Sequence, residues 1–127
     1  AVPKKLLEFL QGEYSTLLFN DSSSIISEDS QMKLSELNTI LAEYPNASLM
    51  IEGHASSDGS KGFNQKLSEK RAASVKDALL SLGISNARLE TAAYGETRPV
   101  SDNTTPGGRK ANRRVKFQRR VEIKIVK

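Results

Sequence analysis

Residues 53–82 of this chain read GHASSDGSKGFNQKLSEKRAASVKDALLSL, and this stretch decides the predicted fold. A polar loop over residues 53–59 leads into a helical pattern over residues 60–82. Projecting that pattern at about 100° per residue gathers its apolar side chains into one arc, which also contains Arg71 and borders on Asn64. These apolar residues are Leu67, Val75, Ala78, Leu79 and Leu82. The projection therefore predicts an arginine that faces inward.

An inward-facing Arg71 needs a partner, because a guanidinium keeps its charge and burying an unpaired charge is costly. Helical spacing alone leaves several arrangements open. The arginine could form a structural ion pair with Glu52 or Asp58, or its alkyl stem could carry the charge outward to water. It could also bind an anionic ligand in a cleft, and this last arrangement would give the position a function.

The rest of the chain alternates between helical and strand-like patterns. Apolar residues at spacings of three and four predict helices over residues 3–10 and 27–44, the second capped by Ser27 and stopped by Pro45. Short alternating runs predict strands over residues 14–19, 48–52, 88–94 and 115–125. Residues 95–110 are rich in proline and glycine and are predicted to form one long loop, of a length that is usually functional.

Helices that connect strands in this order predict an α+β domain. We expect a split βαβ arrangement, in which helices pack on one face of a mixed four-stranded sheet. A length of 127 residues and an apolar content of 37% suit one domain with a modest core. We therefore expect a single domain over residues 1–127, with a helical extension at residues 1–13 and a core at residues 14–127.

Composition argues against several classes of function. The chain has no cysteine and one histidine, His54, so no thiolate metal site or disulfide can form, and no metal or cofactor is expected. No apolar run approaches the ~20 residues that cross a bilayer, so the domain itself is not expected to span a membrane. No activated nucleophile or pair of carboxylates can be placed beside His54, and we expect no enzymatic activity.

A basic segment near the C-terminus is the main support for a rival function. Its cations are Arg109, Lys110, Arg113, Arg114, Lys116, Arg119 and Arg120, in a chain of net charge +4. Such a stripe could bind the phosphates of nucleic acid. However, its only aromatic residue, Phe117, falls on the apolar face of the predicted strand, where it cannot stack on bases. We expect these cations on a solvated strand face that discourages edge pairing, and no nucleic-acid partner.

Several short motifs follow one another in a fixed order. They are Gly53-His54-Ala55, Gly59, Asn64, Leu67-Ser68, Arg71-Ala72, Val75, Tyr94-Gly95, Pro99, Asn103, Gly108-Arg109 and Asn112-Arg113-Arg114-Val115. In order and spacing, this series closely resembles the OmpA-like peptidoglycan-binding domain over about residues 16–126. The resemblance implies a non-catalytic module that binds the stem peptide of the bacterial cell wall. It also implies a periplasmic location, in an outer-membrane-associated protein of a Gram-negative bacterium.

The resemblance also implies the residues of the site. Arg71 would hold the carboxylate of the diaminopimelate residue through paired charge-assisted hydrogen bonds. Asn64, Arg113 and Ala55 would line the same cleft. Arg113 is expected there rather than Arg114, because strand alternation points the two side chains to opposite faces. Another position of the motif series, Arg109, is expected to brace the long loop.

One position departs from the family pattern. The family has an aspartate two residues after the histidine of its Gly-His motif, where this chain has Ser56. Asp58 or Asp21 could supply the missing charge for the ammonium group of diaminopimelate. Losing one hydrogen bond to a charged group costs roughly 1.5–3 kcal/mol, so binding would weaken about tenfold to a hundredfold. The alternative is an OmpA-like interaction module that serves other envelope proteins and has lost wall binding.

Overall fold

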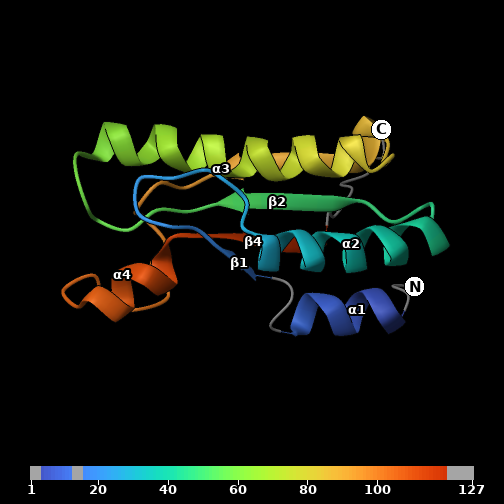
Figure 1. Cartoon of the computed structure of the whole chain (residues 1–127), viewed down its shortest axis with the longest axis horizontal. Helices are drawn as coiled ribbons and strands as arrows, with labels where there is room; N and C mark the ends of the chain where they lie inside the picture. The colour runs from blue at the N-terminus through green and yellow to red at the C-terminus, as the bar shows by residue number, and fades with distance from the viewer. Residues whose placement is uncertain (1–3, 13–15, 120–127) are drawn as a thin grey trace, which may run out of the picture.

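The computed structural model describes residues 4–12 and 16–119 of the chain. In chain order the elements are α1 (Lys4–Gln11), β1 (Thr16–Leu18), α2 (Glu28–Glu43), β2 (Leu49–Gly53), α3 (Lys61–Ser81), a 3₁₀ turn (Asn86–Arg88), β3 (Leu89–Ala93), α4 (Pro106–Asn112) and β4 (Arg114–Arg119). Figure 1 shows the long helices α2 and α3 running roughly along the sheet, with α4 at one end. The predicted strand residues 14–15 and 120–125 lie outside the described residues.

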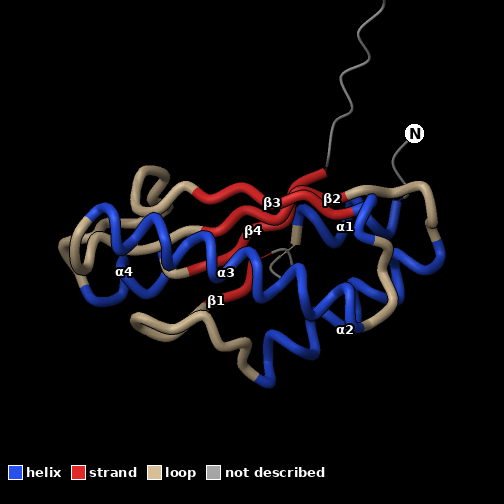
Figure 2. The backbone as a smooth tube through the Cα atoms, turned by 90° about the horizontal axis from the view of Figure 1, so that it is seen from above, coloured by secondary structure: helices blue, strands red, loops and turns tan. Residues whose placement is uncertain are grey.

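The four strands form one mixed sheet in the order β1-β4-β2-β3. Strands β2 and β3 are parallel and are connected through α3, while β4 runs antiparallel to both β1 and β2. The last strand therefore lies between the first two, which splits the βαβ unit. Figure 2 shows α2 and α3 on the same side of the strands. The prediction of an α+β fold with a mixed four-stranded sheet is confirmed.

Alternation along the strands determines the composition of the core. Leu17 of β1, Leu49 and Ile51 of β2, and Val115 and Phe117 of β4 are buried, because they face the helices. Helix α1 belongs to the same core, since Leu6 and Phe9 are buried and the Phe9 ring lies 6.2 Å from that of Phe117. The other core residues include Leu34, Leu37, Leu41, Val75 and Leu79.

Helix α3 presents the arc that the sequence predicts, with one exception. The helix begins after Ser60, whose Oγ accepts a hydrogen bond from the Phe63 N–H at 3.1 Å. Leu67, Val75 and Leu79 are buried as expected. The prediction for Leu82 is wrong: it lies one residue beyond the helix and is exposed, because the chain turns away at Gly83 with φ +101°.

The prediction of one long loop over residues 95–110 is also wrong, because α4 begins within it. Thr105 caps this helix, and its Oγ1 accepts a hydrogen bond from the Gly108 N–H at 3.0 Å. Pro106 occupies the first turn, where its missing N–H costs nothing. Helix α4 matters for the site because it presents Arg109 and ends at Asn112, just before Arg113.

The close approach of β2 and α3 gives a direct test of this packing. A methyl group at Gly53 would overlap the backbone carbonyl of Ser68, so we expect Gly53→Ala to lower the free energy of unfolding by roughly 2 kcal/mol. The matched control is Gly62→Ala in the first turn of α3, where an added methyl group meets nothing within 4 Å. We expect this control to stabilise the domain by about 0.4–1 kcal/mol. Urea denaturation measures both changes, and equal stabilities would contradict the observed packing.

Candidate functional site

Arg71 lies on the inner face of α3 with a side chain that is 0% exposed. Its guanidinium donates hydrogen bonds to backbone carbonyls from two segments of the chain. Nε donates to the Ser23 oxygen at 2.9 Å, Nη2 to the Asn20 oxygen at 3.0 Å and Nη1 to the His54 oxygen at 3.0 Å. The group also lies 5.4 Å from the centre of the Phe19 ring. One side chain thus ties the β1–α2 loop to the end of β2.

The charge of Arg71 is not neutralised by an acid. Among the described residues it forms no ion pair, and neither Glu52 nor Asp58 reaches it. The side chain does not extend to water either, since it is fully buried. Burial, and after it the charge of Arg113, lower the pKa of Arg71 to about 10, while Asp21 acts in the opposite direction. The guanidinium therefore remains cationic at neutral pH.

The hydrogen-bonding capacity of Arg71 is only partly used. A guanidinium carries five N–H donors, and the bonds to Ser23, Asn20 and His54 occupy one on each nitrogen. One N–H on each terminal nitrogen has no acceptor within the described part of the chain. Terminal N–H groups of a guanidinium are the donors that bind a carboxylate through paired hydrogen bonds. The arrangement can accept an anion, provided that the anion can reach it.

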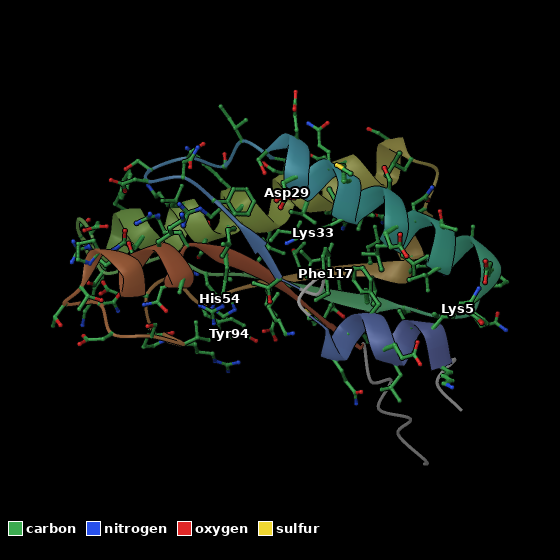
Figure 3. The ribbon with its side chains drawn as sticks, turned by 60° about the horizontal axis from the view of Figure 1, so that its bottom comes forward. Lys5, Asp29, Lys33, His54, Tyr94 and Phe117 are labelled. Carbon is green, nitrogen blue, oxygen red and sulfur yellow. The ribbon has the colours of Figure 1, made fainter. Side chains whose placement is uncertain are left out.

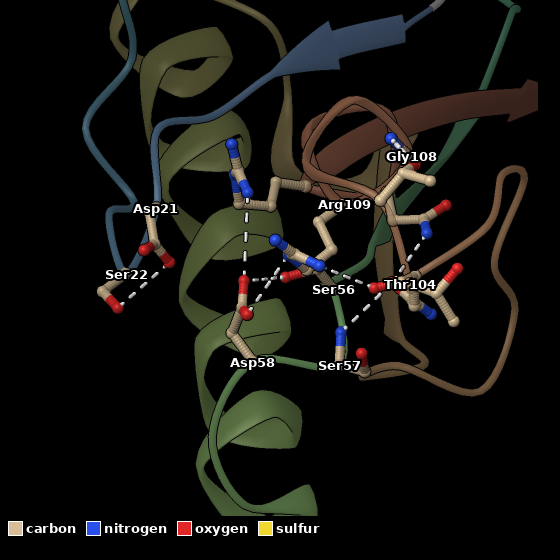
Figure 4. A network of polar contacts seen from close by, with 12 residues as sticks. Asp21, Ser22, Ser56, Ser57, Asp58, Thr104, Gly108 and Arg109 are labelled. Atoms are coloured by element: carbon tan, nitrogen blue, oxygen red, sulfur yellow. Dashed lines mark hydrogen bonds and ion pairs between the residues drawn. The ribbon is translucent and has the colours of Figure 1, made fainter.

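The second part of the site is a polar cluster around Asp58. Ser56 Oγ donates a hydrogen bond to Asp58 Oδ2 at 2.9 Å, and Ser56 is buried. Arg109 Nε lies 3.5 Å from Asp58 Oδ1, and Arg113 Nη1 lies 4.0 Å from Asp58 Oδ2. Figure 4 shows the Asp58 carboxylate facing Ser56 and Arg109, with Asp21 apart from it. Asp58 thus carries a negative charge between two arginines.

Two other predicted site residues lie buried beside this cluster. Asn64, on the first turn of α3, has its Nδ2 3.5 Å from Glu96 Oε1, to which it donates. Ala55 donates its backbone N–H to the Gly95 oxygen at 2.8 Å, which ties the loop after β2 to the loop after β3. The structure therefore brings Ser56, Asp58 and Arg113 into direct contact. The charge of Arg113 acts on Arg71 and lowers its pKa, which links Arg71 to this cluster. The Asn64 side chain faces Glu96 instead.

Sequence reasoning missed most of the contacts that hold the surrounding loops. Arg109 braces the long loop as expected, since its Nη1 donates to the Asn103 oxygen at 2.9 Å. Its additional contact with Asp58 was not expected. The Asn103 side chain also accepts from the Ser57 N–H at 3.3 Å and from Asn112 Nδ2 at 2.8 Å. No sequence pattern could reveal these contacts, because they join residues from separate elements.

The basic segment does not form one solvated strand face. Arg109 lies on α4, and Arg113 turns to Asp58. The expectation is wrong for Arg114 as well, because this side chain is only 6% exposed, on the opposite side of the sheet from Arg113. Nη2 of Arg114 donates to the Arg98 oxygen at 3.0 Å. Among the described side chains of this segment, the cations are thus divided between two faces.

The fold and this site together define an OmpA-like α+β domain. Residues 18–113 match the OmpA family, and the chain belongs to that family. No helix within the described ranges combines the length and the apolar character needed to cross a membrane.

Curated relatives agree with this assignment. The chain is 40% identical over 107 residues to outer membrane porin F of Pseudomonas aeruginosa, which covers 84% of the chain and 31% of the porin. It is 37% identical over 101 residues to the peptidoglycan-associated lipoprotein of Brucella melitensis, covering 80% of the chain and 60% of the lipoprotein. The chain therefore spans about a third of the first relative and less than two thirds of the second.

Solved structures share the fold. The crystal structure of the peptidoglycan-associated lipoprotein from Burkholderia pseudomallei superposes with a TM-score of 0.81 at 25% identity, covering 84% of this chain and 90% of that chain. The C-terminal domain of Helicobacter pylori MotB gives a TM-score of 0.77 at 21% identity, with 84% of each chain covered. At 21% identity, the similarity to MotB concerns the fold alone.

The bonds of Arg71 predict how the site responds to a conservative change. A lysine cannot reach three divergent carbonyls, so we expect Arg71→Lys to lower the free energy of unfolding by about 2 kcal/mol. We also expect faster hydrogen exchange of the backbone amides at residues 20–24. Arg88 is the matched control, because it too donates to three carbonyls, those of Leu41, Tyr44 and Ala47. Arg88→Lys should leave the exchange of residues 20–24 unchanged, and equal exchange in both variants would contradict the tethering role of Arg71.

Proposed function

We propose that this domain binds the stem peptide of peptidoglycan without catalysis, and that Arg71 holds the carboxylate of its diaminopimelate residue. One observation carries the proposal. Arg71 is a fully buried cation with no acidic partner among the described residues and with one unused N–H on each terminal nitrogen. An external carboxylate would satisfy both the charge and these donors. The name of the Brucella melitensis relative, a peptidoglycan-associated lipoprotein, supports this ligand.

The remaining site residues have roles that follow from their contacts. Asp58 would meet the ammonium group of diaminopimelate, in the role that the family pattern gives to an aspartate at position 56. Arg113 would add positive charge for the ligand carboxylate, while Asn64 and Ala55 would line the cleft. Asp58 already interacts with Ser56, Arg109 and Arg113, so it is less available to a ligand than an unpaired acid. We therefore infer weaker binding than an aspartate at position 56 would give.

Access to Arg71 requires movement of the β1–α2 loop. The carbonyls of Asn20 and Ser23 cover the guanidinium, so a carboxylate reaches it only when this loop withdraws. A carboxylate that reaches the guanidinium compensates its buried charge, which the neutral carbonyls do not. The free energy needed to move the loop offsets part of the free energy gained by binding the carboxylate.

In the cell, the domain would anchor its parent protein to the wall. The relative from Pseudomonas aeruginosa is named as an outer membrane porin, and the chain matches 31% of it. The domain is accordingly a periplasmic part of an outer-membrane-associated protein, and peptidoglycan is its partner. Nucleic acid is not a partner in this proposal.

A second candidate function follows from the closed state of the site. Arg71 is 0% exposed, and position 56 lacks the acid of the family pattern. If the β1–α2 loop does not open, Arg71 only holds this loop to the end of β2. The domain then serves as an interaction module for other envelope proteins. The two functions differ in whether wall fragments bind at all.

Pull-down with purified Gram-negative cell wall separates the two functions. We expect the wild-type domain to sediment with the wall, and Arg71→Lys to bind at least about tenfold more weakly. Arg88→Lys, which changes a similarly bonded arginine away from the site, should bind like wild type. Equal binding by wild type and Arg71→Lys would eliminate the proposed carboxylate contact. No binding by wild type would favour the interaction module.

Restoring the acid at position 56 tests ligand identity. We expect Ser56→Asp to raise the affinity for a stem peptide that contains diaminopimelate by about tenfold to a hundredfold. A stem peptide in which the side chain of this residue keeps its carboxylate but lacks the ammonium group offers nothing to the added aspartate and should gain nothing. Isothermal titration with the two peptides measures the difference. The same gain for both peptides would show that the added aspartate does not act on the diaminopimelate centre.

A further inference from the structure

The face of the sheet that points away from α2 and α3 contains a groove of about 680 Å³. Its floor consists of outward-facing residues of β1, β2 and β4, and one wall is the segment at residues 98–100. The lining includes Leu18, Glu52, His54, Arg98, Val100 and Arg114. Arg71 and Asp58 do not line it. A groove of this size suits a small organic ligand or a few residues of peptide.

His54 is the residue in this groove that most requires explanation. Its side chain is buried, and neither ring nitrogen has a hydrogen-bond partner in the described structure. Glu52 Oε1 lies 3.6 Å from His54 Nε2, which is too far for a hydrogen bond. Figure 3 shows the ring beside Tyr94, at a centroid distance of 5.5 Å. Buried polar atoms without partners are uncommon in native proteins, and here the residue that carries them lines an open groove.

The imidazole is neutral at physiological pH. Burial first, and then the charges of Arg114 and Arg98, lower the pKa of His54 to about 4. A neutral ring has one N–H to donate and one nitrogen that accepts. It can therefore donate to an anionic oxygen.

Positive charge predominates in the groove. Arg114 forms part of its floor, and its guanidinium donates to the backbone oxygens of Arg98 and Asn112. Arg98 lies over the Tyr94 ring, with its guanidinium carbon 3.6 Å from the ring centre. Lys116 adds a third cation, and Glu52 is the only acid in the lining. An anionic ligand is favoured by this balance.

We propose that the groove binds the carboxyl terminus of a peptide that ends in an apolar residue. Arg114, Arg98 and the His54 ring receive the terminal carboxylate. Leu18 and Val100 are exposed apolar side chains that contact the last side chain of the peptide. Glu52 accepts a backbone N–H from the peptide. This acceptor distinguishes a peptide from an ionised fatty acid, which has no hydrogen-bond donor.

This site is separate from the proposed wall-binding site. Arg71 is on the inner side of the sheet, whereas the groove is on the open side, so both could be occupied in one molecule. Failure of either proposal leaves the other standing, because they rest on different residues. A protein or peptide whose carboxyl terminus enters this groove would be a second partner of the domain.

NMR titration of the ¹⁵N-labelled domain tests the proposal. The probe is an acetylated tripeptide that ends in leucine, with either a free carboxyl terminus or a carboxamide, at concentrations up to about 10 mM. We expect the free acid to shift the amides of Glu52, His54 and Arg98 saturably, and the carboxamide to bind at least about tenfold more weakly. Octanoate, which lacks an N–H for Glu52, should also bind more weakly than the free acid.

A pair of charge variants locates the binding site. Val100→Glu adds a carboxylate to the groove wall at a side chain that is 64% exposed, and should weaken binding about tenfold. Met32→Glu makes the same kind of change on α2, at a side chain that is 73% exposed, and should leave binding unchanged. The proposal is overturned if the free acid shows no saturable shift, or if its shifts are confined to the surroundings of Arg71. It is also overturned if the carboxamide or octanoate binds as tightly as the free acid, or if Val100→Glu leaves binding of the free acid unchanged.

Discussion

The site depends on the bonds between the guanidinium of Arg71 and three backbone carbonyls. These acceptors belong to Asn20, Ser23 and His54, which lie 51, 48 and 17 residues from Arg71 in sequence. Irregular backbone cannot satisfy its own carbonyls as a helix or strand does, and each unpaired buried carbonyl costs free energy. A single planar cation supplies donors for both loops. The shape of the β1–α2 loop and the course of the chain after β2 therefore depend on one side chain.

The polar cluster at the end of the sheet follows a different principle. Arg71 uses neutral acceptors and keeps an uncompensated charge, whereas Asp58 is the acid on which Arg109 and Arg113 converge. The Asp58 carboxylate thus has two cations near it, whereas Arg71 forms no ion pair among the described residues. A buried cation without a paired acid attracts anions.

Much of this arrangement could be predicted from the sequence, and the limits have physical causes. The inward direction of Arg71 was predictable, because the spacing of Leu67, Val75 and Leu79 determines the buried face of a helix. The mixed four-stranded sheet followed from the alternation of elements and from the family resemblance. Helix α4 was missed because seven residues that include Gly107 and Gly108 show no apolar period and have low helix propensity. The contacts of Asp58 and Asn103 could not be predicted, since they depend on how separate loops meet in space.

His54 belongs to both sides of the sheet, and this has a thermodynamic consequence. Its carbonyl accepts a hydrogen bond from Arg71, while its imidazole borders the groove on the open face. A guest in the groove that shifted the backbone of His54 together with its ring would also move the carbonyl to which the Arg71 guanidinium donates. Any coupling free energy that results is reciprocal, so occupancy on one side alters affinity on the other by the same factor in both directions. His54 would then be the residue through which the two proposed sites influence each other.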